Sequence, residues 1–334
     1  MCRVSRLATG DSDPAKPNIR YSSMKKLNTP LTPITTKQYD IPLPEGVRRW
    51  RRGIIAGSAI ASGVAATGLA LLYWKRHRRS KSFSYAMSTI DTLDVGSGVK
   101  LRIKFETVSH ASLKISYPRA LKRRVKVRVA NQTLSINRLP CRNRWVSGPV
   151  LAELTLPYIS RIRVVGDAQV IATGQNKLDG HFELLQIGGQ IEGLTVDASS
   201  VECQIRGNAK SNLYIISDQT FMGYSGSPEM RVVLQSQGQA HLTATGSGQI
   251  LLLGHTQHLS LTASDRSVVQ AETLTATEAD VLLADSATSQ LSVADKLSYT
   301  LCNESKLLLA HQPKQILQAE ILDAATLEIL DKRR

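Results

Sequence analysis

The feature that most constrains the fold is a turn signal that returns at a nearly constant interval from residue 166 to the C-terminus. Each signal is a Gly, Ala, Ser, Asp or Asn followed by small or polar residues and then by a short run rich in Val, Leu or Ile. The signals begin at Gly166, Gly188, Ala198, Ser217, Ser236, Gly246, Asp265, Asp285, Asn303 and Asp323. Their spacing is close to 20 residues, with half-steps of 10 residues at two places. Such a period predicts stacked repeats, and apolar runs of four to six residues between turns predict that the stack is a β-solenoid.

The charge of the chain is unevenly distributed. The 334 residues carry a net charge of +15, from 42 Lys and Arg against 27 Asp and Glu. Residues 1–163 hold 31 of these cations and 8 of these anions, whereas residues 164–334 hold 11 and 19. The repeat region is therefore mildly acidic, and aromatic residues make up only 5% of the chain. This pattern argues against a nucleic-acid partner, which would favour a basic repeat face or aromatic stacking platforms.

Residues 1–47 have the composition of a tail. They are rich in Pro, Thr and Ser and lack sustained hydrophobic periodicity. We expect a disordered basic tail, because such a segment buries too little apolar surface to fold. A docking peptide for a cytoplasmic partner is the functional alternative.

Residues 53–72 contain no charged residue. A helix of this length spans about 30 Å, the hydrocarbon thickness of a bilayer. Aromatic residues and clusters of Lys and Arg bracket the run on both sides, as at membrane interfaces. We predict that residues 48–81 form a transmembrane helix with basic flanks, an uncleaved signal anchor, rather than a buried soluble helix or a cleaved signal peptide. The balanced flanks do not decide the orientation, and small residues along the helix leave a homo-oligomer open.

Residues 88–334 are predicted to be all-β. From Asp91 onward apolar and polar residues alternate, the period-2 pattern of strands with one buried face. In the repeats, Leu242 and Ala244 are expected to point inward into an aliphatic stack. Cys203 and Cys302 lie in apolar runs and are expected to fill rungs as small hydrophobic residues. The predicted fold is thus a parallel β-helix, a solenoid or roll, preceded by the transmembrane helix and the tail.

The order of the strand motifs resembles the putative auto-transporter adhesin family with the head GIN domain. The resemblance rests on the segments 93–103 (LDVGSGVKLRI), 134–136 (LSI), 154–166 (LTLPYISRIRVVG) and 246–248 (GSG), and it covers about residues 88–315. Several family Gly-Ser-Gly turns are replaced here by Asp-Arg-Ser, Asp-Ser-Ala and Asn-Glu-Ser, which turn geometry tolerates. The resemblance implies a parallel β-helix or roll outside the cytoplasmic membrane. It implies no catalytic residues.

A column of acidic and amide residues is the first candidate for a site. Asp265, Asp285 and Asp323 are expected at one corner of the stack, with Asn303 between the last two. Oxygen ligands about 4.8 Å apart could bind Ca²⁺. The simpler interpretation is that Asp and Asn form tight turns by hydrogen bonding to their own backbone, so no metal site is predicted.

Two further motifs are also given structural interpretations. His255 and His258 are expected in a loop, where no helix sets their spacing for a metal. The segment 223–228 (GYSGSP) lacks the second glycine of a nucleophile elbow and is expected to be a turn between rungs. No catalytic residue and no cofactor are predicted.

The best candidate for a binding surface is basic. Residues 119–128 form the densest basic run of the β domain. One interpretation is the solvated face of a strand with its valines inward. The other is attraction to anionic lipid headgroups, to which each Lys or Arg near the membrane contributes about 1 kcal/mol. Together with the flank of the helix, the candidate surface comprises Lys75, Arg76, Arg78, Arg79, Lys122, Arg123, Arg124, Lys126 and Arg128.

These inferences predict a non-catalytic protein of the cell envelope. It would cross the cell membrane once, with its C-terminal domain periplasmic or extracellular, and would present the solenoid as a platform for adhesion or scaffolding through many weak contacts. Its partners would be the membrane, anionic headgroups, glycans or cell-surface ligands. Two alternatives from other classes are an envelope polysaccharide lyase or hydrolase, and a transmembrane signalling partner whose tail acts inside the cell. The enzyme would need several carboxylates and a Lys or Arg converging in one groove.

Overall fold

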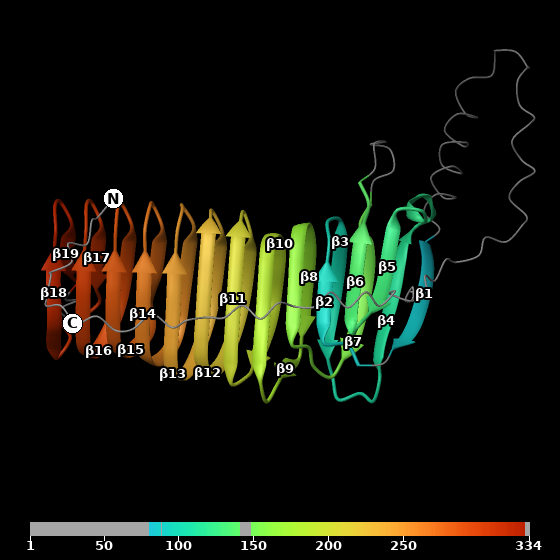
Figure 1. Cartoon of the computed structure of the whole chain (residues 1–334), viewed down its shortest axis with the longest axis horizontal. Coiled ribbons are helices and arrows are strands. Elements are labelled where there is room, and N and C mark those ends of the chain that lie inside the picture. The colour runs from blue at the N-terminus through green and yellow to red at the C-terminus, as the bar shows by residue number, and fades with distance from the viewer. Residues whose placement is uncertain (1–79, 88, 141–147, 331–334) are drawn as a thin grey trace, which may run out of the picture. The chain divides into compact units, whose positions relative to one another are not determined.

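The computed structural model describes residues 80–87, 89–140 and 148–330 (Figure 1). Apart from one short 3-10 helix, η2 (Arg119–Leu121), the regular structure of these residues is β. The N-terminal strands are β1 (Ser80–Met87), β2 (Thr92–Val95), β3 (Val99–Phe105), β4 (Ala111–Pro118), β5 (Val125–Ala130), β6 (Thr133–Arg138) and β7 (Val150–Leu156). The remaining strands are β8 (Arg161–Thr173), β9 (Gln175–Lys177), β10 (His181–Asp197), β11 (Ser200–Gly207), β12 (Lys210–Gly226), β13 (Glu229–Ala244), β14 (Gln249–Ala263), β15 (Val268–Leu283), β16 (Thr288–Leu301), β17 (Lys306–Leu309), β18 (Gln315–Ile321) and β19 (Thr326–Ile329).

The strands wind into a β-solenoid of about eight turns, as the period of 20 residues predicts. From β8 to β19 every pairing is parallel, each strand lying beside the equivalent strand of the next rung. Antiparallel pairs occur only in the N-terminal part of the described chain, where β4 pairs with β1 and β7, and β5 with β6. There β2 lies between β6 and β8 by parallel pairing on both sides (Figure 1).

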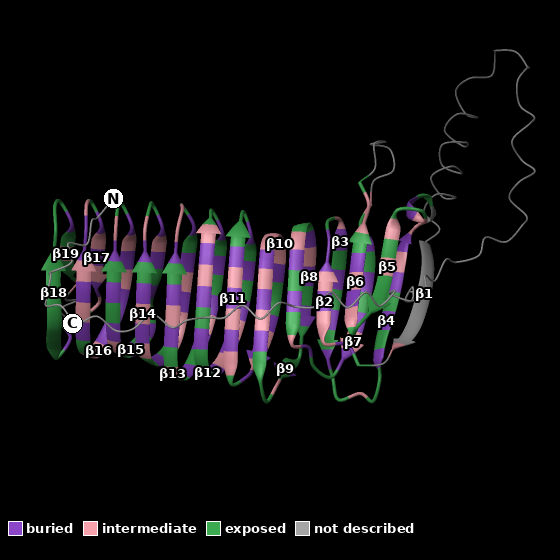
Figure 2. Cartoon of the chain, in the orientation of Figure 1, coloured by how far each residue is buried: buried purple, intermediate pink, exposed green. Residues whose placement is uncertain are grey.

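Each rung contributes one straight segment to each of two opposed faces. We call face A the face that contains β5, β6, β2, the first parts of β8 and β10, all of β11, the later parts of β12 to β16, and β18. Face A is turned toward the viewer in Figure 1. Face B contains the other segments, from β3 and β7 to β17 and β19. Figure 2 shows burial alternating along these segments, as expected when side chains point in turn inward and outward.

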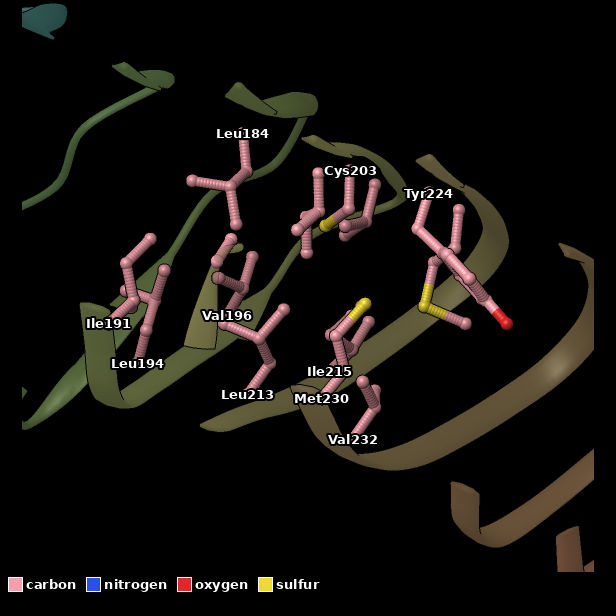
Figure 3. Packing of buried hydrophobic residues seen from close by; sticks show 14 of the residues in the cluster. Leu184, Ile191, Leu194, Val196, Cys203, Leu213, Ile215, Tyr224, Met230 and Val232 are labelled. Carbon is pink, nitrogen blue, oxygen red and sulfur yellow. The ribbon is translucent and has the colours of Figure 1, made fainter. Parts of the chain in front are cut away.

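The interior is a stack of aliphatic columns. Strand registers place Ile162, Leu184, Cys203 and Met222 one above the other in face A, and each is buried. The column continues through Leu242, Leu261, Val281 and Tyr299. Figure 3 shows residues of face A, such as Leu184 and Cys203, pointing toward residues of face B, such as Leu213 and Ile215. Each rung therefore covers the apolar side of its neighbour, and Leu242 and Ala244 are buried as predicted.

One corner of the solenoid requires a left-handed backbone in every rung. Nine residues stacked by register have φ between +59° and +94°. They are Gly166, Gly188, Gly207, Gly226, Gly246, Asp265, Asp285, Asn303 and Asp323. Glycine, Asp and Asn are the residues that adopt this conformation most readily, which explains why the turn signal changes from Gly to Asp or Asn along the chain. We call this set the αL column.

The other turn signals lie at the opposite corner. Ala198 and Ser217 are one rung apart there, and Ser236 follows in the next rung. Steps between the two corners produce the 10-residue half-steps of the sequence. The prediction of separate strands of four to six residues was wrong in detail, because the backbone bends at this second corner without leaving the β conformation. Strands of up to 17 residues result, with register shifts at the bends, as between Ser217 and Gln219 in β12.

The two cysteines of the repeat region fill interior positions as predicted. Cys203 and Cys302 are both buried. Burial, reinforced by the nearby charge of Glu202, raises the pKa of the Cys203 thiol to about 12. The thiol therefore stays protonated and behaves as a small apolar side chain at physiological pH.

The predicted tail (1–47) and nearly all of the predicted transmembrane segment (48–81) lie outside the described residues. Within the described ranges, no helix has the length and apolar character needed to cross a bilayer. The β structure already begins at Ser80, because β1 pairs with β4 along its whole length.

Candidate functional site

The described part of the predicted basic surface lies at the N-terminal end of face A. Lys122, Arg123 and Arg124 occupy the turn between η2 and β5, and Lys126 and Arg128 follow on β5. Alternation along the strand makes the side chains of Lys126 and Arg128 exposed. Val125 and Val127 pack against the core on the other side, as predicted. Val129 departs from the prediction, with 48% of its surface exposed near the C-terminal end of β5.

Most of these cations form no ion pair with a described residue. Arg124 is fixed by a hydrogen bond from its Nη1 to the carbonyl oxygen of Pro140 (3.1 Å). Among the described residues, Lys122, Arg123, Lys126 and Arg128 form no ion pair within 4.0 Å. In the repeat region, by contrast, most lysines are paired, as in the contact of Lys210 with Glu229 (2.6 Å). A cluster of cations without ion pairs attracts phosphate or carboxylate groups.

Strand pairing adds two arginines to the surface. Lys126, Arg138 of β6 and Arg163 of β8 line one cleft of about 750 Å³, together with Asp94 and Asp167. Neither carboxylate pairs with these cations. Asp94 accepts a hydrogen bond from the Ser135 hydroxyl, and Asp167 accepts one from the backbone N–H of Gly98 (2.6 Å). We call Lys122, Arg123, Lys126, Arg128, Arg138 and Arg163 the basic surface.

Sequence reasoning missed Arg138 and Arg163. They are 12 and 37 residues from Lys126, and no local pattern links them to it. The face is assembled by β2, which pairs with β6 on one side and with β8 on the other. Alternation in β8 marks Arg163 as outward-facing, between buried Ile162 and Val164, whereas Arg138 follows the inward phase of β6 and has no such signal. The four predicted cations Lys75, Arg76, Arg78 and Arg79 lie outside the described residues.

The acidic column is a structural element of the turns. Asp265, Asp285, Asn303 and Asp323 belong to the αL column. Three of these side chains bind the backbone or side chain of a neighbouring rung: Asp265 Oδ2 accepts from the N–H of Gly246 (2.8 Å), and Asp285 Oδ1 accepts from Asn303 Nδ2 (3.1 Å). Within the part of the chain that the structure describes, no group of three or more His, Cys, Asp or Glu side chains is arranged to hold a metal ion. The positive φ of these residues agrees with the turn interpretation, but their side-chain hydrogen bonds reach the neighbouring rung and not the residue's own backbone.

Replacing Asp285 with valine should lower the free energy of unfolding by about 2 kcal/mol. A β-branched residue is strained at φ +59°, and the hydrogen bonds to Asp265 and Asn303 are lost. The matched control is Asp285→Asn, which keeps an acceptor and tolerates this φ, with an expected loss below about 0.5 kcal/mol. Urea unfolding measures both. A Ca²⁺-dependent rise of the wild-type midpoint that Asp285→Asn abolishes would contradict the turn interpretation.

The expectation of a histidine loop was wrong. His255 and His258 lie within β14, on either side of the bend at Thr256. His255 belongs to the part of β14 in face B, and His258 begins the part in face A. His258 instead contacts carboxylates of the next rung, with its Nε2 3.2 Å from Asp280. This is an ion pair when the imidazole is protonated, and it joins rungs rather than forming a metal site.

Comparison with known proteins identifies the family. The sequence profile of the family described as putative auto-transporter adhesin, head GIN domain, matches residues 91–313. The chain belongs to this family. The match spans the cleft of the basic surface and the αL column up to Asn303, and it agrees with the resemblance noted in the strand motifs.

Solved structures show the same fold. A putative adhesin from Parabacteroides merdae superposes with a TM-score of 0.53 at 14% identity, over 75% of this chain and 96% of that one. A putative adhesin from Parabacteroides distasonis gives a TM-score of 0.56 at 12% identity, over 75% and 97%. A structure described as a putative lipid binding protein from the same species gives 0.50 at 13% identity, over 75% and 97%. A search of proteins with curated function found no match.

Proposed function

We propose that this head GIN domain protein is a non-catalytic, adhesin-like protein of the cell envelope. In this proposal segment 53–72 crosses the membrane, and the solenoid stands outside the cytoplasm as a platform for adhesion. The observation that carries the proposal is the pair of long faces, on which outward side chains repeat in register from rung to rung. A rigid array of this kind sums many weak contacts with a multivalent ligand.

The distribution of charge supports binding rather than catalysis. On the repeats, carboxylates are spread along the outer faces and pair with lysines one rung away. Examples are Lys296 with Glu278 (2.6 Å) and Lys306 with Glu328 (2.7 Å). A polysaccharide lyase would instead concentrate three or more carboxylates and a cation in one groove, whereas the cleft of the basic surface holds two carboxylates, Asp94 and Asp167. The names of the family and of its structural relatives favour the same class of function.

The decisive experiment combines topology with adhesion. Cells producing the full-length chain are treated with protease from outside, and fragments of residues 88–334 are followed by mass spectrometry. We expect these fragments to be released from intact cells. We also expect the untreated cells, but not shaved ones, to be retained on surfaces coated with glycans or matrix. Protection of the solenoid in intact cells, or equal retention before and after shaving, would refute the proposal.

The basic surface would orient the solenoid against its own membrane. In lipid nanodiscs, tryptic cleavage of the full-length chain at Lys122–Arg124 should be at least about tenfold slower with anionic than with zwitterionic lipid, since each cation contributes about 1 kcal/mol. Salt should remove the protection. The double variant Lys126→Glu and Arg128→Glu should lose it, whereas Lys177→Glu with Arg231→Glu, which changes two exposed cations elsewhere, should keep it. Equal cleavage in both lipids would contradict this orientation.

A further inference from the structure

A second hollow lies on face A, three rungs along from the basic surface. It has a volume of about 340 Å³ and crosses β11, β12 and β13. Strand register puts Gly223 at its centre, between Gln204 on one side and Thr243 on the other. Phe221 and His241 stand at one end, and Arg206 at the other. Its volume is at the lower end of the range for small-molecule sites, about 300–1,000 Å³. We call it the Gly223 groove.

Nothing in the fold requires glycine at position 223. The expected turn at 223–228 was wrong here, because Gly223 lies inside β12 with an extended backbone and no positive φ. A Cβ atom at this position would meet no atom within 4 Å, unlike one at Gly246, Gly248 or Gly254. Glycine inside a strand costs up to about 1 kcal/mol relative to alanine, and it is found where a ligand or backbone approaches closely. No backbone approaches Gly223, so the absence of a side chain leaves open space above the strand at this position.

An aromatic wall closes one end of the groove. The rings of Phe221 and His241 are stacked one rung apart, with centroids 5.0 Å apart and an interplanar angle of 5°. Phe221 still exposes 42% of its surface, although face A around it is mainly polar. The stack holds the phenyl ring in one orientation. An exposed but immobilised aromatic ring offers an apolar surface to a ligand at little further entropic cost.

A hydrogen-bonded row of polar side chains borders the groove along β11. Gln204 donates from Nε2 to Glu202 Oε1 (2.8 Å) and accepts from Arg206 Nη2 at its own Oε1 (3.1 Å). These bonds orient the three side chains but leave Glu202 Oε2 and most of the guanidinium N–H groups available. The opposite wall adds the exposed hydroxyl of Thr243. The groove therefore offers both acceptors and donors in a fixed arrangement.

We propose that the Gly223 groove is a binding subsite for one ring of a neutral saccharide. A sugar ring has an apolar C–H face that suits Phe221, and vicinal hydroxyls that suit the paired atoms of a carboxylate or guanidinium. The lining balances one carboxylate against one guanidinium and contains no lysine, which disfavours an anionic ligand. A peptide strand would need an open sheet edge, and here both edges of β12 are paired. This inference rests on the proposed adhesion function and names a ligand class for it.

The test places a larger side chain at Gly223, in the centre of the groove. The detergent-solubilised full-length chain is applied to an array of neutral and acidic oligosaccharides. We expect binding to neutral members, weakened at least about tenfold in Gly223→Val and in Phe221→Ala. Gly223→Val should keep or raise the unfolding midpoint, because valine suits a strand and has free space there. Thr262→Val, two rungs on in the same outward column, is the matched control and should bind as wild type does.

The outcomes separate this inference from the function on which it rests. Failure to bind any neutral saccharide, binding restricted to acidic ones, or equal binding by wild type and a folded Gly223→Val each overturns the saccharide subsite. If cells still adhere through the solenoid in those cases, the adhesion proposal stands without this subsite. If protease treatment of the cells also leaves their retention unchanged, both proposals fail together.

Discussion

Gly246→Ala should destabilise the protein by about 3 kcal/mol or more, among the largest effects expected of a single methyl group. Gly246 belongs to the αL column, with φ +94°, where an L side chain is strained by about 1–3 kcal/mol. Its Cβ would also stand 2.3 Å from the carbonyl oxygen of Gly226 in the preceding rung. Two stacked rungs would have to separate, and the loss of close packing adds to the strain. Urea unfolding followed by circular dichroism measures the change.

The control for this substitution is Gly223→Ala in β12, one rung away and three residues before the corner residue Gly226. It adds the same methyl group at an ordinary φ and with no atom within 4 Å. We expect no loss of stability and a gain of up to about 1 kcal/mol. Gly246→Asn separates the two causes at the corner, because Asn tolerates the backbone but still carries a Cβ. If Gly246→Asn proves as stable as wild type, the contact with Gly226 is not the source of the effect.

The corner positions were the part of the fold most accessible from the sequence. A positive φ restricts the residue choice to Gly, Asn and Asp, so Gly166 and Asp323 carry the same signal at opposite ends of the stack. Period-2 alternation likewise identified the buried sides of the strands, as in β3 and β4. These features are local, because each residue type reflects only the backbone conformation or the burial at its own position.

Pairing partners were not accessible in the same way. That β2 lies between β6 and β8 depends on contacts between residues about 40 and 70 positions apart, which no local pattern specifies. The described part of the basic surface was therefore recognised only along β5 and the turn before it, and Arg138 and Arg163 were missed. Gly223 shows that a local pattern can also predict the wrong structure. The run Gly-Tyr-Ser-Gly-Ser-Pro has the composition of a turn, yet only its later residues turn, and the glycine that opens the groove has a strand conformation.

Phe182→Ala should cost about 3–5 kcal/mol, the range for removing a buried aromatic side chain. Phe182 is the largest side chain that is fully buried among the described residues. It lies in β10, whose first part pairs with β8 on one side and with β11 on the other, so the cavity weakens two rung interfaces at once. In a stack whose rungs contact only their neighbours, stability is a sum of local terms. We therefore expect the rungs on the two sides of β10 to unfold separately. This should produce new proteolytic cleavage between residues 178 and 200 and a broadened unfolding transition.

The matched control uses the other phenylalanine of the same face. Phe221→Ala removes the same group from the outer surface two rungs away, and should cost less than about 1 kcal/mol. The pair separates the two roles of an aromatic residue in this fold: an inward ring holds adjacent rungs together, and an outward ring is available to a ligand. Equal destabilisation by both substitutions would mean that Phe221 is a structural residue. The Gly223 groove would then have no aromatic side chain free to contact a ligand.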